Sequence, residues 1–185
     1  MKLKIKEIKT DFRGIPLPDH STQGRKFENI LANKGYPVTQ GQGPDYPEYD
    51  LEVKTKDIES KSANSVGSMT SKKIKVTPYP NSSIAKKIQR QFRVKIKDGV
   101  IVSTKVYDFS APFIQEIIKE AYETARAKII AGNTDSYIPG TTFGYFEQKK
   151  LSGGKLTNSW AFRIPVGSMK KLEKMAQSTY GKLFE

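Results

Sequence analysis

The chain has 185 residues, a length that fits one domain, and its 36% of hydrophobic residues can form a core without covalent staples. It has no cysteine and one histidine, which excludes disulfides, the usual zinc ligands and any histidine-based catalytic triad. The apolar runs are far shorter than the ~20 residues that span a bilayer, and the start MKLKIKEIK lacks the apolar segment of a signal peptide. We therefore expect a soluble cytoplasmic protein with no membrane partner.

The first third of the chain predicts a strand followed by a helix. Residues 2–9 alternate lysines with aliphatic residues, a period-2 pattern typical of a short strand. After a proline-rich connection, apolar residues at helical spacing predict a helix from about residue 22 to residue 33. Ser21 or Thr22 would cap its start, and Gly35 would end it.

The middle of the chain predicts a strand, a loop, a basic helix and a hairpin. Residues 37–55 form an irregular Gly/Pro-rich hairpin that leads into the strand DLEVKT. The polar stretch 56–71 is expected to be a loop, and residues 82–92 a short basic helix. Asp98-Gly99 lies between two alternating segments and predicts a two-residue hairpin turn.

The last third predicts a long helix over residues 111–131, a hairpin that turns at residues 152–154, and a final helix after Ser168. Hairpins interleaved with helices indicate an α/β or α+β protein with a mixed sheet flanked by helices. No domain boundary is visible, so residues 1–185 are expected to form a single domain. The buried stripe of the long helix would comprise Phe113, Ile114, Ile117, Ile118, Ala121, Ala125 and Ile129.

Positive charge is concentrated in one part of the sequence. The net charge is +13, and residues 61–97 contain ten basic residues and no acidic one. Such a one-sign stretch repels itself unless it meets a polyanion, and nucleic acid is the commonest polyanionic partner. The ten residues are Lys61, Lys72, Lys73, Lys75, Lys86, Lys87, Arg90, Arg93, Lys95 and Lys97.

The segment GPDYPEYDLEVKTK, residues 43–56, carries the most distinctive chemistry. Strand alternation places Glu52 and Lys54 on one face. They are either an ordinary ion pair or a site in which a carboxylate holds a hard cation beside an amine. Asp45 precedes Glu52 by seven residues and can fold back beside its strand, and Glu28 lies on the apolar side of the preceding helix.

The series Gly24, Glu28, Gly35-Tyr36, Pro44-Asp45 and Glu52-Val53-Lys54 resembles the core of the PD-(D/E)xK nuclease superfamily. It is most similar to the MutH-like and type II restriction endonuclease branches, and the similarity covers residues 22–56. The resemblance implies a restriction-endonuclease-like core in which Asp45 and Glu52 bind Mg²⁺, for which Mn²⁺ would substitute. The backbone carbonyl of Val53 would be a further ligand, and Glu28 would support the metal at a second site or through water. Lys54 would orient or deprotonate the attacking water.

Asp50 is an alternative to Asp45 as a metal ligand. In a regular strand Asp50, Glu52 and Lys54 would share one face. The family pattern instead expects the acid before the strand, at the position of Asp45.

Three functions fit these observations. The first is a Mg²⁺-dependent, sequence-specific endonuclease that nicks duplex DNA as a monomer or cuts both strands as a homodimer, leaving 5′-phosphate and 3′-hydroxyl ends. The second is a structure-selective nuclease such as a Holliday junction resolvase, and the third a non-enzymatic basic DNA-binding module. In each case the loop and helix at about residues 56–97 would follow the phosphate backbone. The expected DNA contacts are Lys61, Lys72, Lys73, Lys75, Lys86, Lys87, Arg90 and Arg93.

Overall fold

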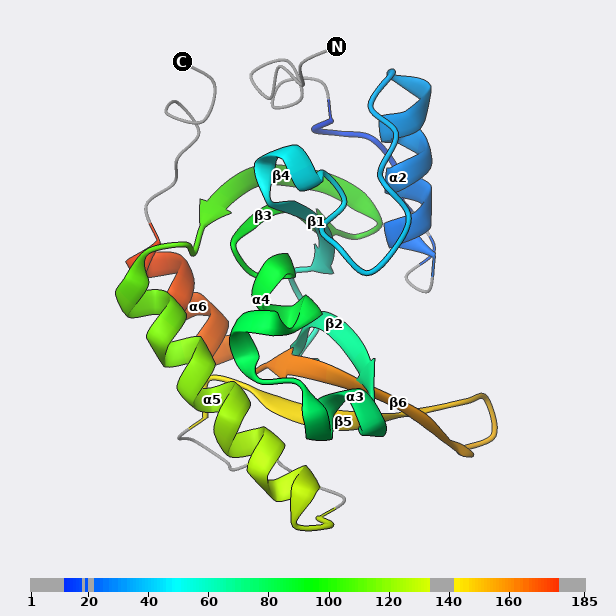
Figure 1. Cartoon of the computed structure of the whole chain (residues 1–185). Coiled ribbons are helices and arrows are strands. Elements are labelled where there is room, and N and C mark those ends of the chain that lie inside the picture. Colours follow the sequence, from blue (N-terminus) through cyan, green and yellow to red (C-terminus); the bar gives the residue numbers. More distant parts are fainter. Residues whose placement is uncertain (1–11, 18, 20–21, 134–141, 177–185) are drawn as a thin grey trace. The chain divides into compact units, whose positions relative to one another are not determined.

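The structure is a computed structural model that describes residues 12–17, 19, 22–133 and 142–176 (Figure 1). The strand expected over residues 2–9 lies outside the described residues. The chain folds as two compact units. The first contains the described residues up to Ser60 together with Arg90–Asp108, and the second contains Lys61–Gln89 and Phe109–Ala176. Each unit is assembled from segments distant in the sequence, so no single position along the chain marks a boundary.

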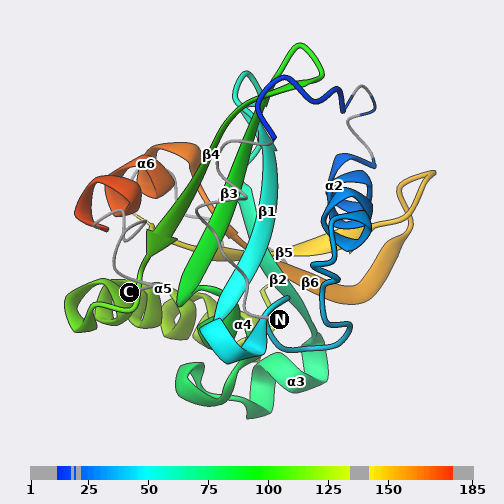
Figure 2. The same cartoon turned by 90° about the horizontal axis from the view of Figure 1, so that it is seen from above.

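The first unit is built on a three-stranded mixed sheet, sheet A, with strand order β1-β3-β4 (Figure 2). β1 (Leu51–Asp57) runs parallel to β3 (Arg90–Lys97), and β3 is antiparallel to β4 (Val100–Asp108). The predicted hairpin turn between β3 and β4 is confirmed: Asp98 and Gly99 have φ angles of 49° and 70°. Positive φ at both positions is typical of the type I′ turns that join twisted strands.

One face of sheet A forms the core of the first unit. The helix α2 (Gln23–Asn33) packs Phe27 and Leu31 against this face, and both side chains are fully buried. The Phe27 ring lies 5.1 Å from that of Phe12 and 6.0 Å from that of Phe92 on β3, measured between ring centroids. The predicted helix is thus confirmed. It ends at Asn33, and Gly35 just beyond it has φ of +85°, a conformation that costs glycine little.

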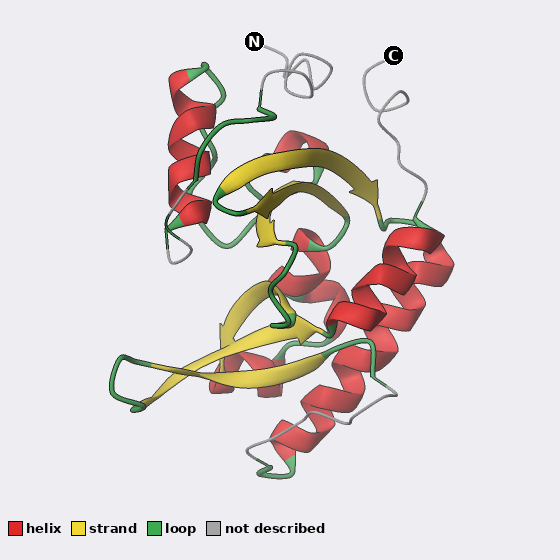
Figure 3. Cartoon of the chain, turned by 180° about the vertical axis from the view of Figure 1, so that it is seen from behind, coloured by secondary structure: helices red, strands yellow, loops and turns green. Residues whose placement is uncertain are grey.

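The second unit contains a three-stranded antiparallel sheet, sheet B, with strand order β2-β6-β5 (Figure 3). Its strands are β2 (Asn64–Thr70), β5 (Tyr145–Lys150) and β6 (Leu156–Ile164). The long helix α5 (Pro112–Ile130) covers one face, where the Tyr122 ring meets the rings of Phe146 and Phe162 at 5.3 and 5.7 Å. The remaining elements are α3 (Ser71–Val76), the 3₁₀ turn η2 (Tyr79–Asn81), α4 (Ser83–Lys87) and α6 (Val166–Met175).

The fold is α+β, as expected, but it has two small sheets where a single mixed sheet was predicted. The prediction of a loop over residues 56–71 was wrong, because β1 continues to Asp57 and β2 occupies Asn64–Thr70. The alternation of buried and exposed residues in β2 is not visible in the sequence, because most of its residues are small and polar. Within β2 only Val66 and Met69 have buried apolar side chains. A bulge between Ser65 and Gly67 interrupts the period further.

The basic helix expected over residues 82–92 is much shorter than predicted. Ser82 caps α4, its Oγ accepting a hydrogen bond from the Ala85 N–H at 3.0 Å. The helix ends at Lys87 because β3 begins at Arg90 and turns its alternate apolar residues into sheet A.

The buried stripe of α5 consists of Ile114, Ile118, Tyr122, Ala125 and Ile129. Phe113 was assigned to this stripe but is exposed, since it lies one position away from the helical repeat. None of the helices in the described part of the chain is both long and apolar enough to cross a membrane.

Candidate active site

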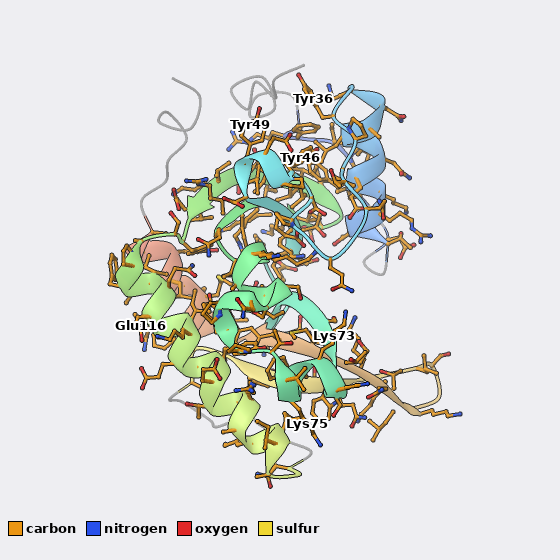
Figure 4. The ribbon with its side chains drawn as sticks, in the orientation of Figure 1. Tyr36, Tyr46, Tyr49, Lys73, Lys75 and Glu116 are labelled. Atoms are coloured by element: carbon orange, nitrogen blue, oxygen red, sulfur yellow. The ribbon has the colours of Figure 1, made fainter. Side chains whose placement is uncertain are left out.

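The segment before β1 is a tight turn that a tyrosine holds in place. The Tyr46 N–H donates to the Leu51 carbonyl at 2.9 Å, and the Leu51 N–H donates back to the Tyr46 carbonyl at 3.2 Å. Between them lies the 3₁₀ turn η1 (Pro47–Tyr49). The Tyr46 hydroxyl donates to the Tyr36 carbonyl at 2.7 Å, so one buried side chain ties the end of the α2–β1 connection to its start. Figure 4 shows Tyr36, Tyr46 and Tyr49 gathered around this turn.

Asp45 folds back onto the strand that follows the turn, as the sequence predicted. Its carboxylate Oδ2 accepts a hydrogen bond from the Val53 N–H at 2.7 Å. Among the described residues β1 is an edge strand of sheet A, and beyond the Tyr46–Leu51 pair no described strand lies on its outer side. The N–H and C=O of one residue in a strand point to the same side. The Val53 carbonyl therefore faces the same open edge as the Asp45 carboxylate.

Glu52 and Lys54 share one face of β1, as strand alternation predicts. The Lys54 Nζ donates to the Glu52 Oε1 at 2.6 Å. Glu52 is only 2% exposed, whereas Lys54 is partly open to solvent. A buried carboxylate is costly unless a cation or hydrogen bonds compensate it. The pair is therefore more than an exposed surface ion pair, because its acidic member has been taken out of water.

Glu28 lies in the same neighbourhood as Asp45, although it comes from α2. The pKa of the Tyr46 phenol is raised above its usual value of 10.0, first because the ring is buried and then because the carboxylates of Asp45, Glu48 and Glu28 lie nearby. All three acids therefore act on one phenol. Tyr46 itself was not predicted as a site residue. Its only signal in the sequence is its position between Asp45 and Pro47.

Asp50 is separated from the strand face that carries Glu52. The strand begins at Leu51, and Asp50 has a left-handed backbone conformation with φ of 50° at the end of η1. Its side chain is exposed. Asp50 would share a face with Glu52 only if the strand included it, and the strand does not. The geometry therefore favours Asp45.

Two further polar residues lie beside the Glu52–Lys54 pair. In the parallel register Glu52 is opposite Gln91 and Lys54 is opposite Arg93. The Arg93 Nη1 donates to the Gln91 Oε1 at 3.0 Å, and both residues are buried, at 4% and 1% exposure. No local pattern predicts Gln91 beside Glu52, because a parallel register joins strands that are distant in the sequence. Arg93 was predicted to contact DNA at the surface, but its side chain is buried.

The basic residues expected to contact DNA are divided between the two units. Lys61, Lys72, Lys73, Lys75 and Lys86 are exposed in the second unit and Lys87 is half-buried there, whereas Arg90 and Arg93 belong to sheet A.

Arg90 makes its contacts with other residues of the first unit. Its Nε lies 3.1 Å from Asp108 Oδ2, and its Nη1 donates to the Tyr49 carbonyl at 3.2 Å, which fastens η1 to the sheet.

Helix α3 presents its lysines outward while its single buried residue, Ile74, anchors it. Arg126 on α5 donates to the Ile74 and Lys75 carbonyls at 2.9 and 2.8 Å, which satisfies the carboxyl end of the helix. Figure 4 labels Lys73 and Lys75 on α3 and Glu116 on α5. The lysines of α3 are thus held on a fixed scaffold.

The oxygen atoms at the junction of the turn and β1 are suited to a hard cation. Within the described ranges, no three acidic or histidine side chains converge into a metal cage. Mg²⁺ does not need one, since it usually binds through one or two carboxylates and keeps several waters. At this junction the Asp45 carboxylate lies against the Val53 backbone, and the Glu52 carboxylate is on the preceding residue of the same strand.

No protein-family model matches the chain, and no curated protein sequence matches it.

Proposed function

We propose that the first unit is the restriction-endonuclease-like core of a Mg²⁺-dependent DNA endonuclease that hydrolyses phosphodiester bonds at specific sequences in duplex DNA. The observation that carries this proposal is the hydrogen bond from the Val53 N–H to Asp45. It holds a carboxylate at the open edge of the strand that also bears the Glu52–Lys54 pair. An acid, a buried acid and an amine in this order support metal-assisted hydrolysis better than a simple structural ion pair.

Asp45, Glu52 and the Val53 carbonyl would hold Mg²⁺, with Glu28 acting through a water molecule. When bound, the metal would polarise the scissile phosphate and lower the pKa of the attacking water. Lys54 lies beside Glu52 and orients that water with its other N–H donors. It also stabilises the negative charge that develops on the phosphate oxygens.

In the reaction a water oxygen forms the new bond to phosphorus as the bond to the 3′-oxygen breaks. The water loses a proton to bulk solvent, and the leaving 3′-oxygen takes up a proton from solvent. The products are a 5′-phosphate and a 3′-hydroxyl. The buried position of Glu52 keeps its carboxylate fixed during this step, so little reorganisation is needed as charge develops.

Duplex DNA is the proposed partner because the chain carries a net charge of +13. The exposed lysines of α3 and α4 supply a cationic surface outside the catalytic strand. Phosphate contacts of this kind give affinity and register without sequence information. Specificity must therefore come from other side chains.

The test is incubation of the full chain with long plasmid DNA, in Mg²⁺ and in EDTA, followed by native and denaturing gels. The Lys54→Ala variant should lose cleavage, whereas Lys56→Ala, two positions further along the same strand, should keep it. Discrete Mg²⁺-dependent fragments are expected, and fragments visible only after denaturation would identify a nickase. Preference for branched over linear DNA would move the assignment to a junction-selective nuclease. Equal activity of Lys54→Ala and the unmodified chain would refute the proposed site.

A further inference from the structure

The β5–β6 hairpin extends beyond the rest of sheet B. β2 pairs with β6 only as far as Ser159, so Leu156–Asn158 and the end of β5 form a ribbon of two strands (Figure 3). Three further residues at a rise of about 3.3 Å each add about 10 Å, and the turn adds more. We call residues 148–158 the ribbon.

Hydrogen bonds fix the conformation of the ribbon at its base and at its tip. The Gln148 Nε2 donates to the Thr157 carbonyl at 2.7 Å, and the Thr157 hydroxyl donates back to the Lys149 carbonyl at 3.1 Å. At the tip the Leu151 N–H donates to the Lys155 carbonyl at 2.8 Å. The ribbon is therefore already ordered, and little conformational entropy would be lost if it were inserted into a partner.

The tip of the ribbon combines lysines with leucines. Leu156 is opposite Lys150 across the strand pair, and Leu151 is opposite Lys155. Each face of the ribbon therefore carries one lysine and one leucine. Leu151 and Leu156 are 56% and 52% exposed, so both apolar side chains are available to a partner.

Lysines alone would be explained as protection of a strand edge against pairing with other chains. That explanation does not account for the leucines, which would promote association instead. Between Glu147 and Glu173 the sequence contains no acidic residue, and Glu147 is paired with Arg163. The tip thus carries lysines and no acid, with one exposed leucine on each face, and a polyanion with an apolar interior matches it.

We propose that the ribbon enters a groove of duplex DNA, with the lysines on the flanking phosphates and the leucines against base edges or base steps. The major groove is about 12 Å wide and 8.5 Å deep and admits a two-stranded ribbon, so the reach of the ribbon fits its depth. Apolar side chains contact thymine methyl groups there. The ribbon would thus be a sequence-sensing element, and this role depends on the proposed function insofar as duplex DNA is the substrate.

The first test places a single fluorescent label at the tip. The chain has no cysteine, so Ser152→Cys gives one attachment site, and Lys170→Cys on the exposed surface of α6 gives a matched control. An environment-sensitive dye at position 152 should shift on addition of duplex DNA in EDTA, whereas the dye at position 170 should not. Bound DNA without a shift at position 152 overturns the proposal. A shift produced by anionic phosphatidylserine vesicles but not by DNA would also overturn it.

The second test separates the two parts of the tip by the salt dependence of DNA binding. Lys150→Gln/Lys155→Gln should lower the slope of log affinity against log salt by about 2, close to 0.9 per lost phosphate contact. Leu151→Ser/Leu156→Ser should leave the slope unchanged but weaken binding by about tenfold, since even partial burial of two leucines contributes that much. Phe113→Ser, an equally exposed apolar residue on α5, serves as the control and should have no effect.

These binding experiments need no catalysis, so the two proposals can fail separately. A tip-dependent affinity without cleavage would leave the ribbon assigned and refute the nuclease. Cleavage with unchanged affinity in both ribbon variants would refute the ribbon and leave the nuclease. Absence of any DNA binding would refute both.

Discussion

Replacement of Asp45 separates its structural role from its proposed catalytic one. Asp45→Asn keeps an oxygen that can accept the Val53 N–H, now 2.7 Å from the carboxylate, but removes the negative charge. Asp45→Ala removes both. A hydrogen bond to a charged group contributes about 1.5–3 kcal/mol and a neutral one about 1 kcal/mol. The asparagine variant should therefore lose about 1 kcal/mol of unfolding free energy, and the alanine variant about 2 kcal/mol.

In a chain of this size 1 kcal/mol corresponds to a Tm shift of about 2–4 °C. We expect Asp45→Asn to remain folded at 25 °C and to melt only slightly earlier, as measured by circular dichroism. Its Mg²⁺-dependent cleavage should fall by about 10³-fold, because a lost metal ligand costs several kcal/mol of transition-state stabilisation. Asp45→Ala should be equally inactive and clearly less stable.

Full cleavage by Asp45→Asn would show that the charge is not needed and would refute the metal assignment. Asp50→Ala would then be the next variant to assay. Equal loss of stability in the two Asp45 variants would refute the account of the hydrogen bond, since only one of them removes the acceptor.

Three further predictions concern neighbouring groups. Lys54→Met should lower the unfolding free energy by about 1–3 kcal/mol, because it leaves the buried Glu52 carboxylate without its cation. In urea titrations the double variant Glu52→Gln/Lys54→Met should recover most of that loss, but it should stay inactive. Lys73→Gln should reduce the slope of log affinity for DNA against log salt by about 0.9, whereas Arg93→Gln should leave it unchanged, because of the two side chains only Lys73 is exposed. Equal slopes in the two variants would contradict the prediction. The pKa of Tyr46 is higher in the folded protein than in the unfolded chain, so the free energy of unfolding should fall as the pH rises above 10.0. In alkaline unfolding titrations Tyr46→Phe should make this fall less steep, and an unchanged fall would contradict the prediction.

Local signals in the sequence were sufficient for much of the fold. Asp98-Gly99 predicted its hairpin because the type I′ turn demands a particular pair of residues. The helical repeats predicted α2 and α5 because apolar spacing is decided within one element. Asp45 was predicted beside the Glu52 strand because Pro47 forces the intervening chain to turn.

The remainder depends on partners that are remote in the sequence. β2 is a strand because Val66 and Met69 are buried when it pairs with β6, and its own residues are mostly small and polar. Gln91 lies next to Glu52 only through a parallel register between strands that a long crossover separates. Tyr46 acquired its role from burial beside three acids. Neither burial nor register of this kind can be computed from a short window of sequence.

The interleaving of the two units has a consequence for synthesis of the protein. Among the described strands β1 pairs along its length with β3, so when the ribosome has released Leu51–Asp57 that pairing cannot form until Arg90–Lys97 follows. During that interval the segment Lys61–Gln89 emerges, and it in turn waits for β6 to complete sheet B. A chain that stops after Gln89 therefore contains neither sheet, and a premature stop codon in this region should yield a product for proteolysis rather than a smaller folded protein.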